Sequence, residues 1–548
     1  MIKTLIAADR SERERFRIPR SVQQSIPIQK IYRDGIWQTG GKFSRTWRFA
    51  DINYALASHE DQRDMFTAYC GALNSLPTDA TTKITINNRR LNGADFQRSV
   101  LMRERGDSLD SYRREYNRVL TDKAAESNDL IQDKYITVSV ARKNMDEART
   151  FFHRVDADLS KNFGRLESGA KALDNQDRLR IFHDFFRPGE EEHFRFDLSD
   201  AMKKGHDFRD YICPDGLCFK ADHFEMGGKV GRVLFLRDYA SYIKDSFVSE
   251  LCDLDRDLML SIDILPVPTD EAARQLQSTL LGVETNVANW QRRQNANNNF
   301  TATIPYDMEL QRKETKEMLD DLTTRDQRMM FGLVTLVHLA DSKEQLDSDT
   351  ETLYSTARKH LCQLSTLRWQ QKDGLDTVLP YGLRKIQVLR TLTTESTAVL
   401  IPFRAQEIMQ PNGLYYGQNA VSKNMIVADR RLLLNGNSFR LGVSGSGKSM
   451  SAKEEIVQIA LSTEDDILIL DPESEFGYLT ETLGGEVIRI SATSDTHINA
   501  LDMDRAYGDE RNPIVSKSEF VLSLFEQLIG DGMVTAKEKS ILGRCTEQ

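Results

Sequence analysis

Residues 440–456 read RLGVSGSGKSMSAKEEI, and this stretch decides what the C-terminal part of the chain is expected to be. Gly442 to Ser449 fit the pattern of a glycine, four residues, Gly-Lys and then Ser or Thr, with no mismatch. Backbone N–H groups can curl around a polyphosphate where glycines allow close approach and positive φ angles. The stretch therefore predicts a loop that binds nucleotide phosphates; a glycine-rich hinge is the alternative.

The residues of this loop have distinct expected roles towards ATP and Mg²⁺, the two predicted cofactors. Lys448 can reach the β and γ phosphates, and the hydroxyl of Ser449 can ligate the magnesium ion. The following helix adds its free N–H groups to the same anion site. We predict Lys448 and Glu475 as catalytic residues and Ser449 as the metal ligand. The predicted nucleotide-binding residues are Gly442, Val443, Ser444, Gly445, Ser446, Gly447, Lys448, Ser449, Met450 and Asp471.

The segments around the loop predict an α/β domain with a parallel, RecA-like sheet. Residues 437–442 and 484–491 read as strands. The four apolar residues 467–470 predict a further strand that ends at Asp471, at the sheet edge where ligands bind. Helices are expected over 448–462, over 516–530 and from 535 onward. Arg440 is unusual for a buried strand, so either that strand is an edge or Arg440 has a specific anionic partner.

A P-loop enzyme also needs an acidic residue on a later strand to hold its metal ion. Asp471 follows the first helix directly, which makes its strand the second, and no later run of four apolar residues ends in Asp-Glu. We therefore expect the chain to be truncated before the acidic strand motif, with an incomplete sheet.

The first 395 residues predict α+β structure. We expect hairpins over 28–49, strands at 81–89, 134–142 and 258–267, and a helical arm over 270–326. A strand, a helix and a strand at 329–339, 342–361 and 363–369 indicate a split strand-helix-strand unit. MDEAR (145–149) and TDEAAR (269–274) are similar, and chance accounts for this better than duplication. The predicted domains are 1–250, a partner-docking region, 251–395, a middle domain with the arm, and 396–548, the ATPase domain.

Bulk composition narrows the class of protein. The 548 residues carry a formal net charge of −10, with 40% hydrophobic and 28% charged residues. These are globular proportions, and the acidic balance argues against a chain that coats nucleic acid. The first residues contain too few apolar side chains for a signal peptide. The longest apolar run, 331–340, is about half as long as a membrane span.

The order of the C-terminal motifs resembles the large ATPases of type IV secretion and conjugation, the VirB/TraE-like division of the HerA–FtsK-like P-loop motors. GQNAVSKNMI (417–426), LLLNGNSFRLGVSGSGKS (432–449), AKEEI (452–456), LILDPESEF (468–476) and INALDM (498–503) carry the resemblance. By this resemblance Lys448 and Ser449 match the nucleotide and magnesium positions, and Asp471, Pro472 and Glu475 match the motif of the second strand.

The resemblance implies a cytoplasmic ATPase, peripheral at the cytoplasmic face of the cell membrane. It further implies a working homo-hexamer docked on inner-membrane secretion-channel proteins, with no transmembrane segment of its own. Such a motor energises pilus or channel assembly and the transfer of DNA or protein. Two alternatives stay open: a DNA-translocating pump, and a scaffold that senses nucleotide without turnover. The basic runs at 292–294 and 311–316 could contact DNA, but nearby acidic residues favour a solvated face.

Overall fold

The computed structural model describes residues 19, 21–90, 96, 100–125, 130–240, 242–254, 256–297, 303–491, 493–497, 499–502, 513–530 and 532–547. The start of the chain, where a signal peptide was judged absent, and Ile498 and Met503 of the INALDM motif lie outside these residues. The chain divides into two compact units, Met1–Ser438 and Phe439–Gln548. Our expected boundaries followed residues 250 and 395, whereas strands from both sides of residue 250 share one sheet.

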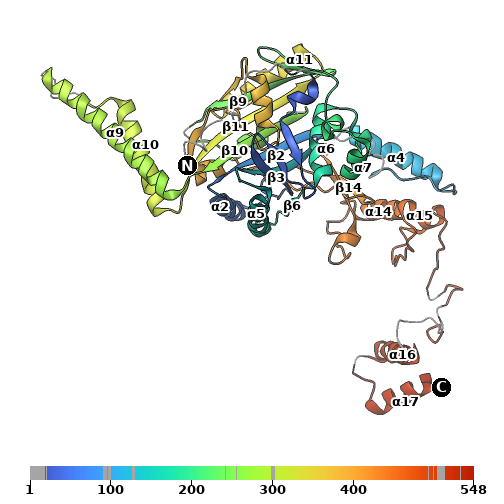
Figure 1. Cartoon of the computed structure of the whole chain (residues 1–548). Helices are drawn as coiled ribbons and strands as arrows, with labels where there is room; N and C mark the ends of the chain where they lie inside the picture. The colour runs from blue at the N-terminus through green and yellow to red at the C-terminus, as the bar shows by residue number, and fades with distance from the viewer. Residues whose placement is uncertain are drawn as a thin grey trace. The chain divides into compact units, whose positions relative to one another are not determined.

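The first unit is built around an antiparallel sheet of 13 strands (Figure 1). The strands are β1 (Ile28–Ile31), β2 (Trp37–Thr39), β3 (Lys42–Phe49), β4 (Ala80–Arg90), β5 (Leu130–Val140), β6 (Ala170–Ala172), β7 (Leu217–Phe219), β8 (Phe224–Met226), β9 (Lys229–Asp238), β10 (Leu258–Pro266), β11 (Met329–Ala340), β12 (Gln363–Thr366) and β13 (Arg390–Thr393). They follow the order β1-β2-β3-β5-β4-β10-β11-β9-β8-β7, with β6 beside β3, β12 beside β9 and β13 beside β11.

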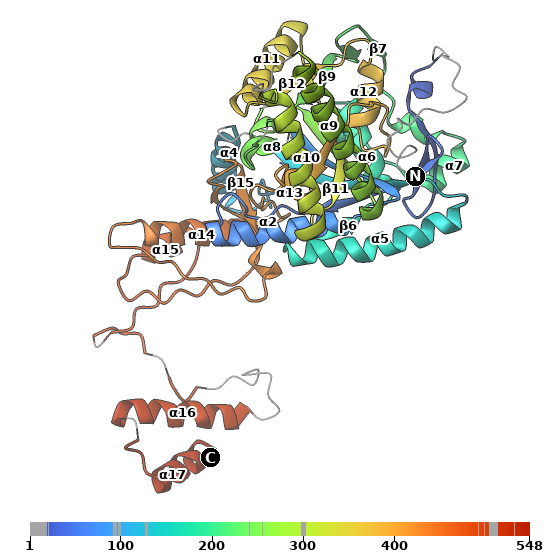
Figure 2. The same cartoon turned by 90° about the vertical axis from the view of Figure 1, so that its left-hand side faces the viewer.

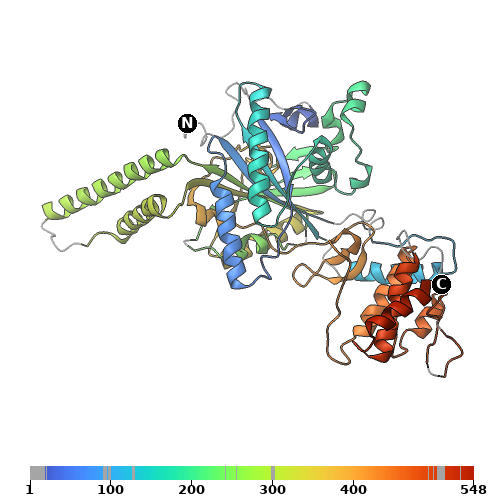
Figure 3. The ribbon, with the colours of Figure 1, turned by 90° about the horizontal axis from the view of Figure 1, so that it is seen from below.

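Helices cover both faces of this sheet. Those of the first unit are α2 (His59–Asn74), α4 (Asp110–Ala125), α5 (Met145–Arg165), α6 (Asn175–Phe186), α7 (Leu198–Lys204), α8 (Ser246–Leu251), α9 (Thr269–Ala296), α10 (Tyr306–Thr324), α11 (Lys343–Lys359), α12 (Gln371–Val378) and α13 (Thr394–Ala398). One apolar core joins the sheet to α2, α5, α8 and α11, and a second joins it to α6 and α12. Figure 3 shows α2 and α5 side by side on the same face.

The sheet contains the same split arrangement twice. In one half β3, α2, β4, β5, α5 and β6 follow one another along the chain, and the strands lie in the order β6-β3-β5-β4. In the other half β9, α8, β10, β11, α11 and β12 do the same, in the order β12-β9-β11-β10. This is the ferredoxin-like β-α-β-β-α-β order. The split unit predicted at 329–369 is therefore confirmed, and it has a counterpart.

The pairing registers of the two halves also match. Equivalent cross-strand rows are Ala172, Trp47, Ile136 and Ile84 in one half and Thr366, Leu234, Leu336 and Leu260 in the other. These rows make Thr85 the equivalent of Ser261. The same two residues face each other where β4 pairs with β10, and their hydroxyls lie 2.9 Å apart in the buried centre of the sheet. A local twofold axis therefore passes through this pair.

The duplication is also visible in the sequence as a repeated string. This string differs from the similar pair MDEAR (145–149) and TDEAAR (269–274). TGGKFSR (39–45) and MGGKVGR (226–232) form the equivalent hairpins β2–β3 and β8–β9. Gly40 and Gly227 hold φ angles of 55° and 56°, which glycine adopts without strain. MDEAR begins α5 but TDEAAR begins α9, so those strings are not equivalent, and the chance explanation of their similarity fits the structure.

Two insertions extend the first unit. The predicted helical arm is confirmed as α9 and α10, which lie side by side and leave the sheet as a hairpin (Figure 1). In the arm, Arg312 Nε lies 2.8 Å from Glu284 Oε1. In the first half, α4 packs against the small hairpin of β14 (Leu414–Gln418) and β15 (Met425–Ala428). Among the described helices, none combines the length and apolarity required to cross a bilayer.

The second unit holds α14 (Lys448–Ser462), α15 (Gly477–Thr482), α16 (Pro513–Ile529) and α17 (Ala536–Glu547). The predicted helices are confirmed, but the predicted RecA-like parallel sheet is wrong: residues 437–442, 467–470 and 484–491 form no strand, and the described part of the chain contains no parallel sheet. An apolar run becomes a strand only where a neighbour satisfies its backbone groups. Here Leu468 and Leu470 remain 90% and 89% exposed.

Candidate functional site

The phosphate loop, residues 442–449, runs directly into α14. Gly445 and Gly447 have φ angles of 78° and 88°, and Gly447 is the residue that precedes the helix. A Cβ atom added to Gly442 would lie 2.3 Å from Ser446 Oγ, so this position has no room for a side chain without rearrangement. The glycine spacing thus produces the tight loop that the sequence predicts, although no flanking strand supports it in the described residues.

Lys448 is the first residue of α14, and its side chain folds back over the loop. Its Nζ atom donates to the carbonyl oxygens of Gly442, at 2.7 Å, and Val443, at 3.3 Å. Ser449 follows in the first helical turn and Met450 is exposed. The positive charge of Lys448 therefore lies over the loop and next to the N-terminus of α14, an arrangement that suits an anion.

Arg440 has the specific anionic partner that the sequence left as one of two possibilities. Its guanidinium forms an ion pair with Glu455, whose side chain is 9% exposed and lies on α14. The pair ties the chain that leads into the phosphate loop to the helix that follows it.

Asp471 and Glu475 lie in a turn at 471–476. Asp471 Oδ2 accepts from the backbone N–H of Phe476 at 2.8 Å, and this bond, with others from residues 473–475, holds the pKa of the Asp471 carboxyl below its ordinary value. Lys453 Nζ lies 5.4 Å from the centre of the Phe476 ring, which places the turn next to α14. Glu475 is exposed, and among the described residues no hydrogen bond or ion pair joins either acid to the phosphate loop.

The hydroxyl of Ser449 is the one protein group predicted to bind the magnesium ion. Within the described ranges, no group of three or more His, Cys, Asp or Glu side chains could hold a metal ion. A magnesium ion that arrives with a nucleotide takes most of its ligands from phosphates and water and needs few from the protein. The residues present fit that mode of binding.

Replacing Gly447 tests the loop geometry. In the Gly447→Ala variant a side chain must adopt a left-handed conformation, which costs about 1–2 kcal/mol. We expect the affinity for Mg-ATP to fall roughly 5- to 30-fold, since each 1.4 kcal/mol is a factor of ten. Gly436→Ala is the matched control, because Gly436 has no positive φ and no atom would crowd its Cβ. Equal affinities of the two variants, measured by titration calorimetry, would contradict the assigned geometry.

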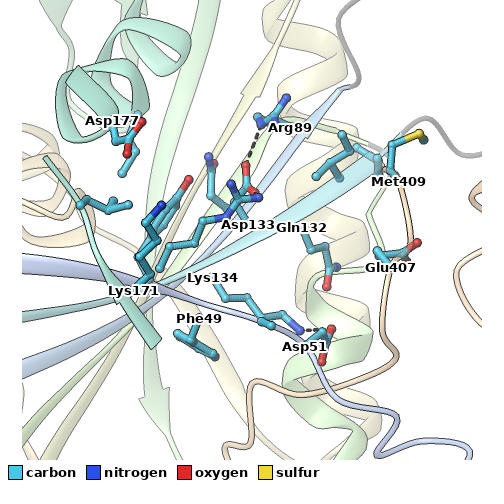
Figure 4. Close-up of a pocket in the computed structure, with 18 of the residues that line it drawn as sticks. Phe49, Asp51, Arg89, Gln132, Asp133, Lys134, Lys171, Asp177, Glu407 and Met409 are labelled. Atoms are coloured by element: carbon cyan, nitrogen blue, oxygen red, sulfur yellow. Dashed lines mark hydrogen bonds and ion pairs between the residues drawn. The ribbon is translucent and has the colours of Figure 1, made fainter. Parts of the chain in front are cut away.

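A second candidate region is a cavity of about 690 Å³ in the first unit (Figure 4). Asp133, on β5, accepts from Arg48 Nη2 at 2.5 Å and from Arg89 Nε at 2.8 Å. Lys134, the next residue, is buried and pairs with Asp51. These ion pairs line the cavity, and the contacts of Asp133 join strands β3, β4 and β5.

Asp133 should make stability depend on pH. Burial alone would raise the pKa of its carboxyl, but the charges of Arg89 and Arg48 outweigh burial and hold the pKa below its ordinary value. Because the pKa is lower in the folded state, the contribution is present above about pH 4, the ordinary range, and is lost as pH falls through the folded value. We expect Asp133→Asn to be less stable than wild type at pH 7 and the gap to narrow towards pH 3. A gap independent of pH, measured by urea unfolding, would contradict this assignment.

Sequence reasoning missed this cavity because its charges come from distant segments. Arg48 and Asp133 are 85 positions apart and meet only through the register of β3 and β5. The one local signal is the charged pair Asp133 and Lys134 inside β5, whose other residues carry no charge.

No model of a known protein family matches this chain, and no curated protein matches it. The resemblance to secretion ATPases therefore stays a prediction, and the phosphate loop itself carries the functional proposal.

Proposed function

We propose that the second unit binds ATP together with Mg²⁺ through residues 442–449 and that the chain acts as an ATPase. The observation that carries this proposal is the loop itself: two glycines with positive φ, a helix that begins at its end, and a lysine folded across it. These features combine a glycine-rich backbone, a helix N-terminus and the charge of a lysine in one short segment, a combination that favours the binding of phosphate groups.

The chain's own residues have separable tasks in this proposal. Backbone N–H groups of the loop hold the phosphates, and Lys448 exchanges its bonds to the loop carbonyls for bonds to phosphate oxygens. Ser449 offers its hydroxyl to the magnesium ion, which would neutralise charge on the phosphates during hydrolysis. Asp471 shapes the neighbouring turn, and Glu475 is the carboxylate proposed to orient water.

At the level of the cell, we infer from the resemblance that this ATPase energises a type IV secretion or conjugative transfer apparatus. It would work as a homo-hexamer, peripheral at the cytoplasmic face of the membrane, and dock on inner-membrane channel proteins.

A second candidate is a scaffold that senses nucleotide without turnover. The observation that favours it is the position of Asp471, whose carboxylate is engaged by its own turn and has no hydrogen bond or ion pair to the loop in the described residues. Both candidates require nucleotide binding, and they differ only in the fate of the bound ATP.

Titration calorimetry with Mg-ATP, followed by a phosphate-release assay, tests these proposals in order. Binding with release supports the ATPase, and binding without release supports the sensing scaffold. Absence of binding by the folded chain would exclude both. Adding DNA distinguishes the pump predicted as an alternative, because phosphate release would then rise with DNA and lose that increase at high salt.

A further inference from the structure

β12 is an edge strand of the first unit. It pairs with β9 along one side, and no described strand pairs along the other. Figure 2 shows β12 next to α11 and β9. An unpaired strand edge presents backbone N–H and C=O groups to which a further strand can bond.

Two large apolar side chains flank this edge. Leu361 precedes β12 and is 82% exposed, and Trp369 follows it and is 83% exposed. Both hold positive φ angles, 57° and 60°, which side chains other than glycine rarely adopt. Neither side chain is packed into the fold, so the stability of the unit does not account for them.

The other half of the duplicated sheet provides an internal comparison. At the end of α5 the N–H of Ser168 bonds to the carbonyl of Phe163, and Glu167 holds a φ angle of 58°. At the end of α11 the N–H of Cys362 bonds to the carbonyl of Ala357, with Leu361 in the same position. The turn therefore belongs to the repeated fold, whereas an exposed apolar side chain occurs only in the second half.

Positive charge surrounds the same edge. A cleft of about 390 Å³ beside β12 is lined by Arg237, Arg358 and Arg368. Asp238 lies 3.7 Å from Arg237, and no carboxylate of a described residue lies within ion-pair distance of Arg358 or Arg368. In a chain with a net charge of −10, three guanidinium groups beside one strand, two of them without a carboxylate of a described residue in ion-pair distance, favour an acidic partner.

We propose that the edge of β12 binds an extended, acidic segment of a partner protein, which joins the sheet as an additional strand. Backbone bonds to Gln363–Thr366 supply the pairing, the arginines receive carboxylates, and Leu361 and Trp369 contact apolar side chains at the two ends. The surface lies in the first unit, and the proposal is independent of nucleotide binding.

A synthetic peptide tests the proposal directly. The probe is fluorescently labelled Leu-Glu-Val-Glu-Val-Glu-Val-Leu, and its anisotropy is followed as the full chain is added. We expect saturable binding that weakens as salt rises, because exposed charges are screened. A peptide with Lys in place of Glu, and one with N-methylated peptide bonds on alternate residues, should each bind at least tenfold more weakly. Equal binding of all three peptides would overturn the proposal.

Variants of the chain separate binding from folding. Leu361→Gly and Trp369→Gly should keep or raise the stability of the unit, because glycine suits their φ angles, yet lower the affinity for the peptide at least tenfold. Glu167→Gly makes the same backbone change in the other half and should leave the affinity unchanged. The double variant Arg358→Gln, Arg368→Gln should lose affinity as well.

Other occupants of the edge are outcomes of the same experiments. Self-association that these variants abolish, measured by light scattering, would assign the edge to a second copy of the chain and overturn the proposal. Competition by a single-stranded oligonucleotide with no binding of the acidic peptide would assign it to nucleic acid and overturn the proposal as well. Unchanged affinity in Leu361→Gly, Trp369→Gly and the arginine variant would also refute it.

Discussion

Lys448→Ala is expected to lower the affinity of the chain for Mg-ATP by roughly 10- to 150-fold. In the structure the ammonium group spans the phosphate loop and bonds to carbonyl oxygens of Gly442 and Val443. A phosphate oxygen is a better partner for this charge, and a hydrogen bond between charged groups contributes about 1.5–3 kcal/mol. Each 1.4 kcal/mol corresponds to a factor of ten in the dissociation constant. Titration calorimetry measures the difference.

Lys453→Ala is the matched control for this variant. Lys453 lies on the same helix, and its ammonium faces the ring of Phe476 instead of the loop. We expect its affinity for Mg-ATP to stay within about twofold of wild type, since screened charges off the site contribute little. If both lysine variants bound as tightly as wild type, residues 442–449 would not be a phosphate site. If both lost affinity equally, the effect would come from the general charge of α14.

Lys83→Met is expected to destabilise the first unit by about 3–5 kcal/mol. Lys83 and Asp263 face each other on the central strands β4 and β10, with 2.8 Å between Nζ and Oδ2, and their side chains are 1% and 0% exposed. Lys83 also donates to the carbonyl of Thr377 in α12. Removing Lys83 deprives the buried carboxylate of Asp263 of the ammonium group beside it, and breaking a buried pair in this way costs more than the intact pair contributes.

The duplication supplies replacements that the fold already accepts. In the matched registers Lys83 is equivalent to Met259, and Asp263 is equivalent to Asn87. The double variant Lys83→Met, Asp263→Asn should therefore lose much less stability than the sum of the single variants. All four tryptophans lie in the first unit, so their fluorescence during urea unfolding reports on this unit alone. Strictly additive losses would show that the two charges do not interact.

The secondary structure of the first unit was largely predictable, because its strands and helices carry strong local patterns. β10 and β11 are mostly apolar and buried along their whole length. Asn144 and Ser342 precede α5 and α11, and their side chains accept from the N–H groups of Glu147 and Gln345. Such signals depend on neighbours along the chain. The duplication was not predictable from the sequence, because only one short string is similar between the two halves. Elsewhere the halves share pairing registers, which the sequence does not show.

The conformation of the phosphate loop was predictable from the sequence, but the prediction of a parallel sheet around it is wrong. Glycines at fixed spacing followed by a helix determine the conformation of residues 442–449, since both depend on a few adjacent residues. A parallel sheet depends on strands far apart in sequence, and no local pattern guarantees that a partner is present. The same limit hid the contacts of Arg48 and Arg89 with Asp133.

The sequence by itself determined the helices, most strands of the first unit and the glycine loop, because backbone propensity, capping and apolar periodicity act over one or two helical turns. Only the tertiary structure decided which strands pair, that two equivalent halves meet at Thr85 and Ser261, that Arg440 bonds to Glu455, and that the edge of β12 stays open. These features depend on contacts between distant residues, whose free energy is gained only when the whole sheet assembles.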